Sequence, residues 1–261
     1  MNKLSQRGVS LIELMIGIVI GLVILAGVTN IWLNTIMSSS DTLRQSKLNQ
    51  ELTTLMSVMS SDIMRAGITG NLNYTNPQTN PFNQVDNTAL EVIDNRVDNA
   101  QVTWANAATG GSCIVYSYDR NLDGNVDDVE VLGFRLNNGA VEMRQNPEGS
   151  GPDPDSCADA DGTWIPVTDS RIITITTLNF AFDNSQCINT REPNGVNEDG
   201  DADTDEADEM DCYTAAPATG DVTVEARQID ITLAGQLVSD ASINLSMEQS
   251  VRIRNDLVRQ F

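Results

Sequence analysis

The sequence contains no histidine among its 261 residues. Histidine is the side chain whose ordinary pKa suits acid–base catalysis near neutral pH, and it is the commonest metal ligand. Its absence excludes histidine-based general-base, triad and metal chemistry. The sequence also lacks a nucleophile motif and a glycine-rich phosphate loop, so an enzyme is the least favoured class of function.

Positive charge is scarce as well. Lys and Arg number 15 against 37 Asp and Glu, which gives a formal net charge of −22. A nucleic-acid-binding surface requires a basic patch, so this balance argues against nucleic acid as a partner. A strongly acidic surface instead favours solubility outside the cell and attracts cations.

The chain does have a long apolar segment near its start. Residues Leu14–Leu33 are almost wholly apolar or glycine, which is about the ~20 residues that a membrane-spanning helix requires. Gly8 precedes this run, whereas the cleavage site of a secretory signal peptide follows its apolar core. Lys3 and Arg7 lie before the run and the next cation is Arg44, so the N-terminus is predicted to be cytoplasmic.

The stretch RG-VSLIELMIGIVIG, which begins at Arg7, resembles the class III signal of type IV prepilins and pseudopilins. The resemblance implies that residues 1–8 are a leader peptide, that a membrane peptidase cuts after Gly8, and that the new N-terminus, Val9, is methylated. The acidic residue that this family carries at the fifth mature position falls on Glu13.

The position of Glu13 requires an explanation, because a carboxylate inside an apolar segment is costly in free energy. In a filament, the free α-amino group of a neighbouring subunit would lie in the same apolar core. The carboxylate and the ammonium group would then neutralise each other and set the register between subunits. The alternative is a simple membrane anchor that tolerates an acid near its cytoplasmic edge.

Residues 9–37 are therefore predicted to be a transmembrane or filament-core helix, and residues 38–66 its amphipathic continuation. Gly67 is the predicted stop of one helix that runs from Val9 to Ala66. The continuation is predicted from a single apolar stripe with the helical spacings 4, 3, 4 and 4. The stripe consists of Leu48, Leu52, Leu55, Met59 and Ile63.

Residues 67–261 are predicted to form a β-rich periplasmic head, because short runs rich in Val, Ile, Thr, Tyr and Phe follow the helix. Strands after one long helix predict an α+β fold, with the helix packed on an antiparallel sheet, and the pilin resemblance implies the same fold. The candidate strands are Ala89–Ile93, Ser112–Tyr118, Val129–Leu136, Ala140–Arg144, Arg171–Phe182, Val224–Leu233 and Leu245–Arg254.

Two acidic insertions rich in Gly and Pro interrupt the predicted sheet, near residues 145–169 and 184–221, and each contains cysteine. Four cysteines in an exported domain favour disulfides, and a Cys-x-x-Cys redox or zinc motif is absent. Four cysteines allow three pairings, among which the sequence does not choose. The preferred hypothesis is the sequence-local pairing, Cys113–Cys157 and Cys187–Cys212.

The segment from Asp119 to Glu130 fits the calcium-loop pattern D-x-[DN]-x-[DN]-G-x5-E. Alternate residues supply oxygen ligands, Gly124 allows a sharp turn, and Glu130 would close the shell with both oxygens. Its flanks are strand-like, so the prediction is a calcium-binding β-hairpin loop. The alternative is a solvated acidic turn, since Asp, Asn and Gly are ordinary turn formers. The predicted ligands are Asp119, Asn121, Asp123, Asn125 (backbone carbonyl), Asp127 (through water) and Glu130.

A second acidic run, from Asn197 to Asp211, has no register with the full ligand set, so a solvated acidic loop is the favoured interpretation. Two further stretches, Met64–Gly67 and Ser250–Asn255, resemble the PilW-type minor pilins. The resemblance implies a single-pass inner-membrane protein that primes type IV pilus assembly and reaches the pilus tip.

The implied partners are the prepilin peptidase, other minor pilins, the major pilin and inner-membrane lipid, and Ca²⁺ is the single cofactor predicted. Two other functions stay open. One is a pseudopilin of a type II secretion system, which shares the whole N-terminal argument. The other is a calcium-dependent adhesion module at the pilus tip.

Overall fold

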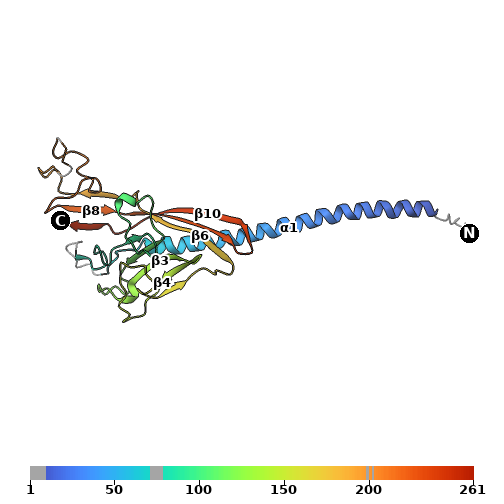
Figure 1. Cartoon of the computed structure of the whole chain (residues 1–261), viewed down its shortest axis with the longest axis horizontal. Helices are drawn as coiled ribbons and strands as arrows, with labels where there is room; N and C mark the ends of the chain where they lie inside the picture. The colour runs from blue at the N-terminus through green and yellow to red at the C-terminus, as the bar shows by residue number, and fades with distance from the viewer. Residues whose placement is uncertain (1–9, 71–78, 198–199, 202) are drawn as a thin grey trace, which may run out of the picture. The chain divides into compact units, whose positions relative to one another are not determined.

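The computed structural model describes residues 10–70, 79–197, 200–201 and 203–261. The chain divides into two compact units, residues 1–47 and residues 48–261. One helix, α1 (Leu11–Ile63), belongs to both units (Figure 1). Residues up to Lys47 form the described part of the first unit, and the helix from Leu48 onward is packed into the second.

The end of α1 is fixed by Gly67. The helix ends at Ile63, slightly before the predicted Ala66, and a short turn carries the chain on to Gly67. Gly67 has a φ of +74°, which glycine adopts without steric strain. Its N–H donates to the carbonyl of Ser117 at 2.8 Å, so the turn is tied directly to a strand. The predicted start of the helix, Val9, lies outside the described residues.

The described residues of the second unit form three antiparallel sheets, which confirms the predicted α+β class. The first sheet has the order β1-β2-β3-β4-β5, the second β10-β9-β6 and the third β11-β8-β7. The strands of the first sheet are β1 (Glu91–Ile93), β2 (Cys113–Ser117), β3 (Val131–Asn137), β4 (Ala140–Arg144) and β5 (Trp164–Pro166). Those of the second are β6 (Ile173–Ala181), β9 (Gln228–Leu237) and β10 (Asp240–Arg252), and those of the third are β7 (Gln186–Asn189), β8 (Val222–Ala226) and β11 (Leu257–Gln260).

The largest departure from the predicted strands occurs at Arg227. The sequence predicted one strand over Val224–Leu233, but Arg227 divides it into β8 of the third sheet and β9 of the second. The partner strands β10 and β11 are likewise separate, and the N–H of Ile253 between them donates to the Arg227 carbonyl at 3.0 Å. Strands β5, β7 and β11 were not predicted. The first two of these lie inside the insertions.

Two glycines allow the first and second sheets to approach each other. Gly111 and Phe180 exchange backbone hydrogen bonds of 3.0 and 2.8 Å. A Cβ atom at Gly111 would stand 2.1 Å from the carbonyl oxygen of Ile93, and one at Gly110 would stand 2.2 Å from that of Phe180. A side chain at Gly110 would therefore push β6 of the second sheet away, and one at Gly111 would collide with β1 of the first sheet.

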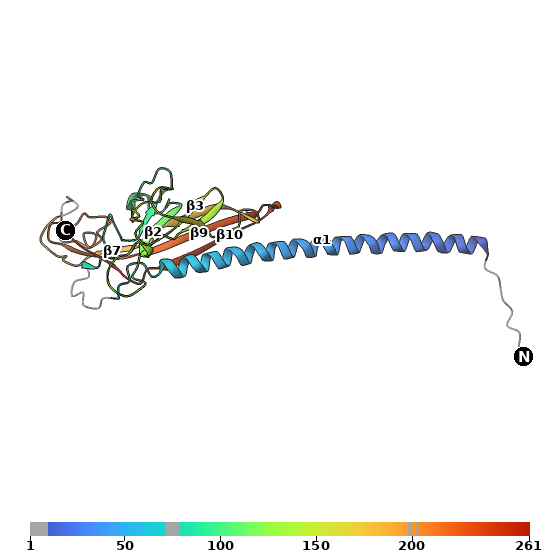
Figure 2. The same cartoon turned by 90° about the horizontal axis from the view of Figure 1, so that it is seen from below.

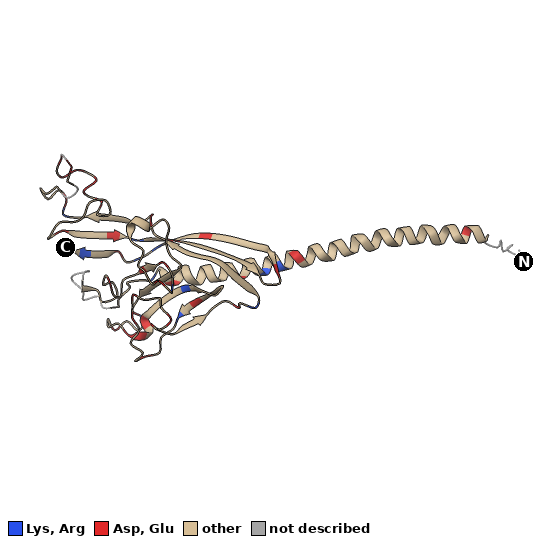
Figure 3. Cartoon of the chain, in the orientation of Figure 1, with Lys and Arg blue, Asp and Glu red and all other residues tan. Residues whose placement is uncertain are grey.

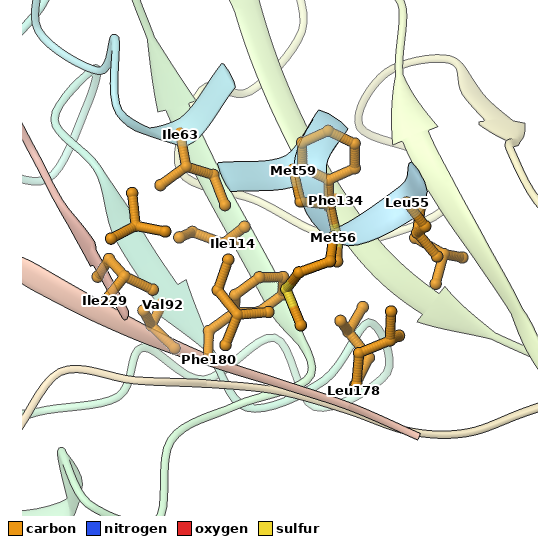
Figure 4. Close-up of a cluster of buried hydrophobic side chains, with 14 of the residues drawn as sticks. Leu55, Met56, Met59, Ile63, Val92, Ile114, Phe134, Leu178, Phe180 and Ile229 are labelled. Carbon is orange, nitrogen blue, oxygen red and sulfur yellow. The ribbon is translucent and has the colours of Figure 1, made fainter. Parts of the chain in front are cut away.

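The core forms where the last turns of α1 meet these sheets, whose strands lie on one side of the helix (Figure 2). Side chains of α1 gather with Ile114 and Phe134 of the first sheet and with Phe180 and Ile229 of the second (Figure 4). Each such side chain contributes about 1.5–3 kcal/mol when fully buried. The buried residues of the helix include the whole predicted stripe: Leu48, Leu52, Leu55, Met59 and Ile63, together with Met56.

A polar cluster fixes the rotation of the helix end. Asp62 accepts hydrogen bonds from the hydroxyls of Tyr116, at 2.6 Å, and Tyr118, at 2.7 Å. Burial raises the pKa of both tyrosines, and the hydrogen bond to Asp62 adds to it, so that the pKa of Tyr118 is about 12. Both hydroxyls therefore stay protonated at neutral pH and hold α1 to β2.

The stability of the second unit should depend on pH through Glu91, which is 7% exposed in β1. Burial, and secondarily the charge of Asp155, raises its pKa from 4.5 to about 7. The folded state therefore keeps a proton that the unfolded chain releases. The stability contributed by the protonated carboxyl is complete below about pH 4.5 and is lost as the pH rises to about 7.

We expect Glu91→Gln to remove this dependence. The variant should match the wild type near pH 4.5 and unfold at a higher temperature above pH 7. The measurement is the difference in Tm between the two proteins from about pH 4 to 8. Glu51→Gln, which changes an exposed carboxylate of α1, should show no such trend. A constant difference between wild type and Glu91→Gln over this range would contradict the assignment.

Candidate functional site

The first part of α1 presents an apolar surface on all sides. Every large apolar side chain from Leu11 to Met37 is exposed, with Leu11 77% and Leu25 62% exposed. By length and composition, this helix is able to cross a membrane. A helix that is apolar all round is typical of a membrane span or of a core packed among other helices.

Glu13 is the one charged residue near the start of this surface. It lies in the first turn of α1, where the partial positive charge of the helix end favours a carboxylate. No other charged residue follows until Asp41, so the helix between the two is uniformly uncharged (Figure 3). The predicted cleavage and methylation residues, Gly8 and Val9, lie outside the described residues.

Several polar side chains of this segment bond to their own helix. Thr29 donates to the Leu25 carbonyl at 2.8 Å, and Asn30 donates to the Ala26 carbonyl at 3.1 Å. Such local bonds lower the cost of polar groups in lipid, where water does not supply partners. Among the described residues from 10 to 40, Glu13 is the one that carries a charge, and in lipid this charge would need a partner.

The predicted calcium loop connects β2 and β3, which are antiparallel neighbours, so it is a hairpin connection as expected. Asp119 begins the loop and is buried. Its carboxylate accepts N–H groups from Leu122 at 2.5 Å, Gly124 at 2.9 Å and Gly70 at 2.8 Å. One side chain thus organises the loop and also ties it to the segment that follows α1.

Glu130 organises the other end of the same loop. It is fully buried and accepts N–H groups from Arg120 at 2.6 Å, Asn121 at 3.3 Å and Asp127 at 3.1 Å. The Asn121 amide donates to both Asp123 and Asp127 at 3.1 Å. This amide lies between two carboxylates that would otherwise repel each other.

These contacts bear on whether a cation fits. Among the described residues, which include the whole loop, no group of three or more acidic or cysteine side chains is gathered around a common point for a metal. The loop carboxylates instead accept hydrogen bonds from backbone N–H groups and from the Asn121 side-chain amide. The ligand residues therefore share one loop without forming a coordination shell in this structure, and calcium binding stays a prediction.

Both disulfides of the preferred pairing are present in the structure. Cys113–Cys157 joins β2 to the first insertion, and Cys187–Cys212 closes the second insertion. In the chain-entropy description, closing loops of 44 and 25 residues contributes on the order of 3–4 kcal/mol each.

Two arginines that the sequence analysis did not single out hold the first insertion in place. Arg144 is fully buried and donates to the carbonyls of Asp153 at 2.6 Å and Asp161 at 2.7 Å. Arg135 pairs with Asp159 at 2.6 Å, and its guanidinium lies 4.3 Å from the centre of the Trp164 ring. The insertion is thus held to the first sheet by buried positive charge as well as by a disulfide.

An exposed apolar N-terminal helix, whose last turns are buried against antiparallel sheets, defines a class of prepilin-like α+β proteins. A prokaryotic N-terminal methylation motif matches residues 3–29, a range that includes Gly8, Val9 and Glu13. Residues 41–253 match the family described as prepilin peptidase-dependent protein B. The chain belongs to the prepilin peptidase-dependent protein B family.

No curated protein and no solved structure matches the chain. The family supports a prepilin-like minor pilin that is a substrate of prepilin peptidase, and proteins of the pilin-like kind are typically not enzymes. The family match does not extend to the PilW type that Met64–Gly67 and Ser250–Asn255 predicted, so this narrower assignment stays a prediction.

The loop geometry yields a test of the calcium prediction. We expect calorimetry on the full chain in detergent micelles to detect calcium binding, and Asp123→Ala to abolish it, because Asp123 is an exposed ligand of the pattern. Glu130→Gln should destabilise the protein by about 1–3 kcal/mol even without calcium, because it weakens buried acceptors of three N–H groups. Asp123→Ala should not.

Asp208→Ala, which removes an exposed acid of the second acidic run, is the matched control and should leave calcium binding unchanged. If the wild-type protein releases no heat with calcium, the loop is a hydrogen-bonded turn and not a calcium site. Equal losses in Asp123→Ala and Asp208→Ala would show nonspecific attraction to an acidic surface.

Proposed function

We propose that this chain is a minor pilin that takes part in the assembly of a type IV pilus. The observation that carries the proposal is the exposed apolar surface of residues 11–37 with a single carboxylate, Glu13, in its first turn. Such a surface is stable only in lipid or among other apolar helices. The methylation motif and the family add that prepilin peptidase processes the chain.

In the proposed mechanism, prepilin peptidase cuts after Gly8, and Val9 becomes a methylated N-terminus. The mature helix then leaves the bilayer for a bundle of similar helices. Glu13 pairs with the α-amino group of a neighbouring subunit, because each charge alone would be costly in an apolar core. The pair fixes the axial register of the bundle, while apolar contacts supply most of the attraction.

The proposed topology follows from the distribution of cations. Lys3 and Arg7 lie just before the apolar run, whereas the first cations after it are Arg44 and Lys47, well beyond its end. The N-terminus is therefore cytoplasmic and the head is periplasmic. In the PilW-type role, the chain joins other minor pilins and primes the addition of the major pilin, and it is carried to the pilus tip. Two disulfides suit an oxidising periplasm.

We expect Glu13→Ala to leave processing intact and to reduce assembly. Mass spectrometry of the purified chain should still detect cleavage after Gly8, because the carboxylate does not take part in that bond. Co-purification with partner minor pilins should fall by at least about tenfold, because a neighbour's ammonium group would be left unpaired in an apolar core. Surface pili should fall with it.

Glu51→Ala is the matched control, since it removes an exposed carboxylate from the same helix within the second unit. It should leave both processing and co-purification unchanged. Normal piliation and normal recovery of partners in Glu13→Ala would show that the apolar segment is a simple membrane anchor. Loss of cleavage in the variant would instead assign Glu13 to peptidase recognition.

A clean deletion distinguishes the proposal from the two other functions. We expect a strain without this chain to lose surface pili, counted by electron microscopy, while it still exports its secreted proteins. Intact pili with lost secretion would make the chain a pseudopilin of a type II system. Pili that form normally but fail to attach, and that attach only with calcium when the chain is restored, would make it an adhesion module.

A further inference from the structure

The second unit contains a cavity of about 450 Å³ that the pilin-like function does not use. It lies where β1 meets the break between β8 and β9, and residues of the second insertion complete it. Its volume is within the range of small-molecule sites, and apolar surface forms most of its lining. Leu90, Val102 and Leu257 are among the apolar residues that line it.

Three aromatic rings form one wall of this cavity. Trp104 stacks on Tyr213 with ring centres 3.7 Å apart and an angle of 7° between the planes. Phe182 lies against the same Trp104 ring at 6.2 Å. All three side chains are half-buried and line the cavity, so they offer a flat apolar ligand a surface for ring contacts.

Arg227 lines the same cavity and is 6% exposed. Its guanidinium donates to the carbonyl of Leu90 at 3.3 Å and to the side chain of Asn83 at 2.8 Å. Its Nε–H has no hydrogen-bond partner, and no carboxylate of the described residues lies within ion-pair distance of it. A buried guanidinium that lacks a counter-charge is costly, so an anion in the cavity would be stabilised.

The carboxylates near Arg227 do not supply this counter-charge. Glu225, also at the cavity, is already paired with Arg259. Glu91 accepts a hydrogen bond from the Asp86 N–H, and burial raises the pKa of this carboxyl to about 7, so it is only partly ionised at neutral pH. Arg144, another deeply buried arginine, also has an Nε–H without a partner, but three backbone carbonyls accept from the rest of its guanidinium, against one for Arg227.

We propose that this cavity is a binding site for a small monocarboxylate with a flat apolar body. The body lies against the wall formed by Trp104, Phe182 and Tyr213, and the carboxylate is the counter-ion of Arg227. One negative charge is the complement of Arg227, because Glu225 is already paired with Arg259, and Asp86, another acid of the lining, is exposed to solvent. The site belongs to the second unit alone, so ligand binding is separate from the helix surface that carries assembly.

Phenylacetate is the probe, and phenylacetamide is its neutral counterpart of nearly the same shape. With the full chain in detergent micelles, we expect calorimetry to show saturable binding of phenylacetate. Phenylacetamide should bind at least about tenfold more weakly, because it does not bring a charge to Arg227. This comparison uses only the wild-type protein, so it does not depend on whether any variant folds.

Trp104→Ala removes part of the aromatic wall at a half-buried position and should weaken phenylacetate binding by at least about tenfold. Trp164→Phe is the matched control, since Trp164 lies against Arg135 and is not part of the cavity. It should bind as the wild type does. The proposal is overturned if phenylacetate does not bind, if acid and amide bind equally, or if both tryptophan variants bind like the wild type.

Discussion

The structure depends on the burial of one apolar stripe of a single helix. Leu48, Leu52, Met59 and Ile63 are 0% exposed, and the first and second sheets converge on them. Among the described residues of the first unit, the same kinds of side chain are exposed. Burial of these side chains in lipid or among other apolar helices would release free energy of the same kind.

Features that depend on short-range periodicity were predictable from the sequence. The 4, 3, 4, 4 spacing from Leu48 to Ile63 identified the buried face of the helix, since side chains at these spacings share one face. Alternation and β-branched residues located most strands of the first two sheets. Gly67 was recognisable as a helix stop because few other residues adopt its positive φ without strain. The disulfides were open among three pairings, because sequence spacing does not fix which sulfurs meet.

Features that depend on contacts distant in sequence were not predictable. Arg227 occupies a break between two strands of different sheets. The apolar alternation changes phase there, from even-numbered positions before Arg227 to odd-numbered positions after it, but a change of phase does not tell that the two strands belong to different sheets. Arg135 and Arg144 bond to carbonyls and carboxylates of an insertion that composition alone describes as solvated. The calcium-loop pattern was ambiguous for a related reason. An Asp that begins such a loop and a Glu that ends it are also good acceptors for backbone N–H groups, as Asp119 and Glu130 demonstrate.

The charge of the head determines what its surface can do. The chain has 15 cations against 37 acids. Among the described residues both signs are buried, three arginines (Arg135, Arg144 and Arg227) and six acids, so the exposed surface stays strongly acidic. Two copies of this head placed side by side would repel each other, whereas a head with fewer acidic groups would not. Contacts between apolar helices discriminate less between subunits than charge does, so the charge of the heads can determine which subunits lie next to each other. Repulsion between acidic heads disfavours contact between two copies of this chain and favours contact with less acidic subunits, which is the behaviour expected of a minor pilin.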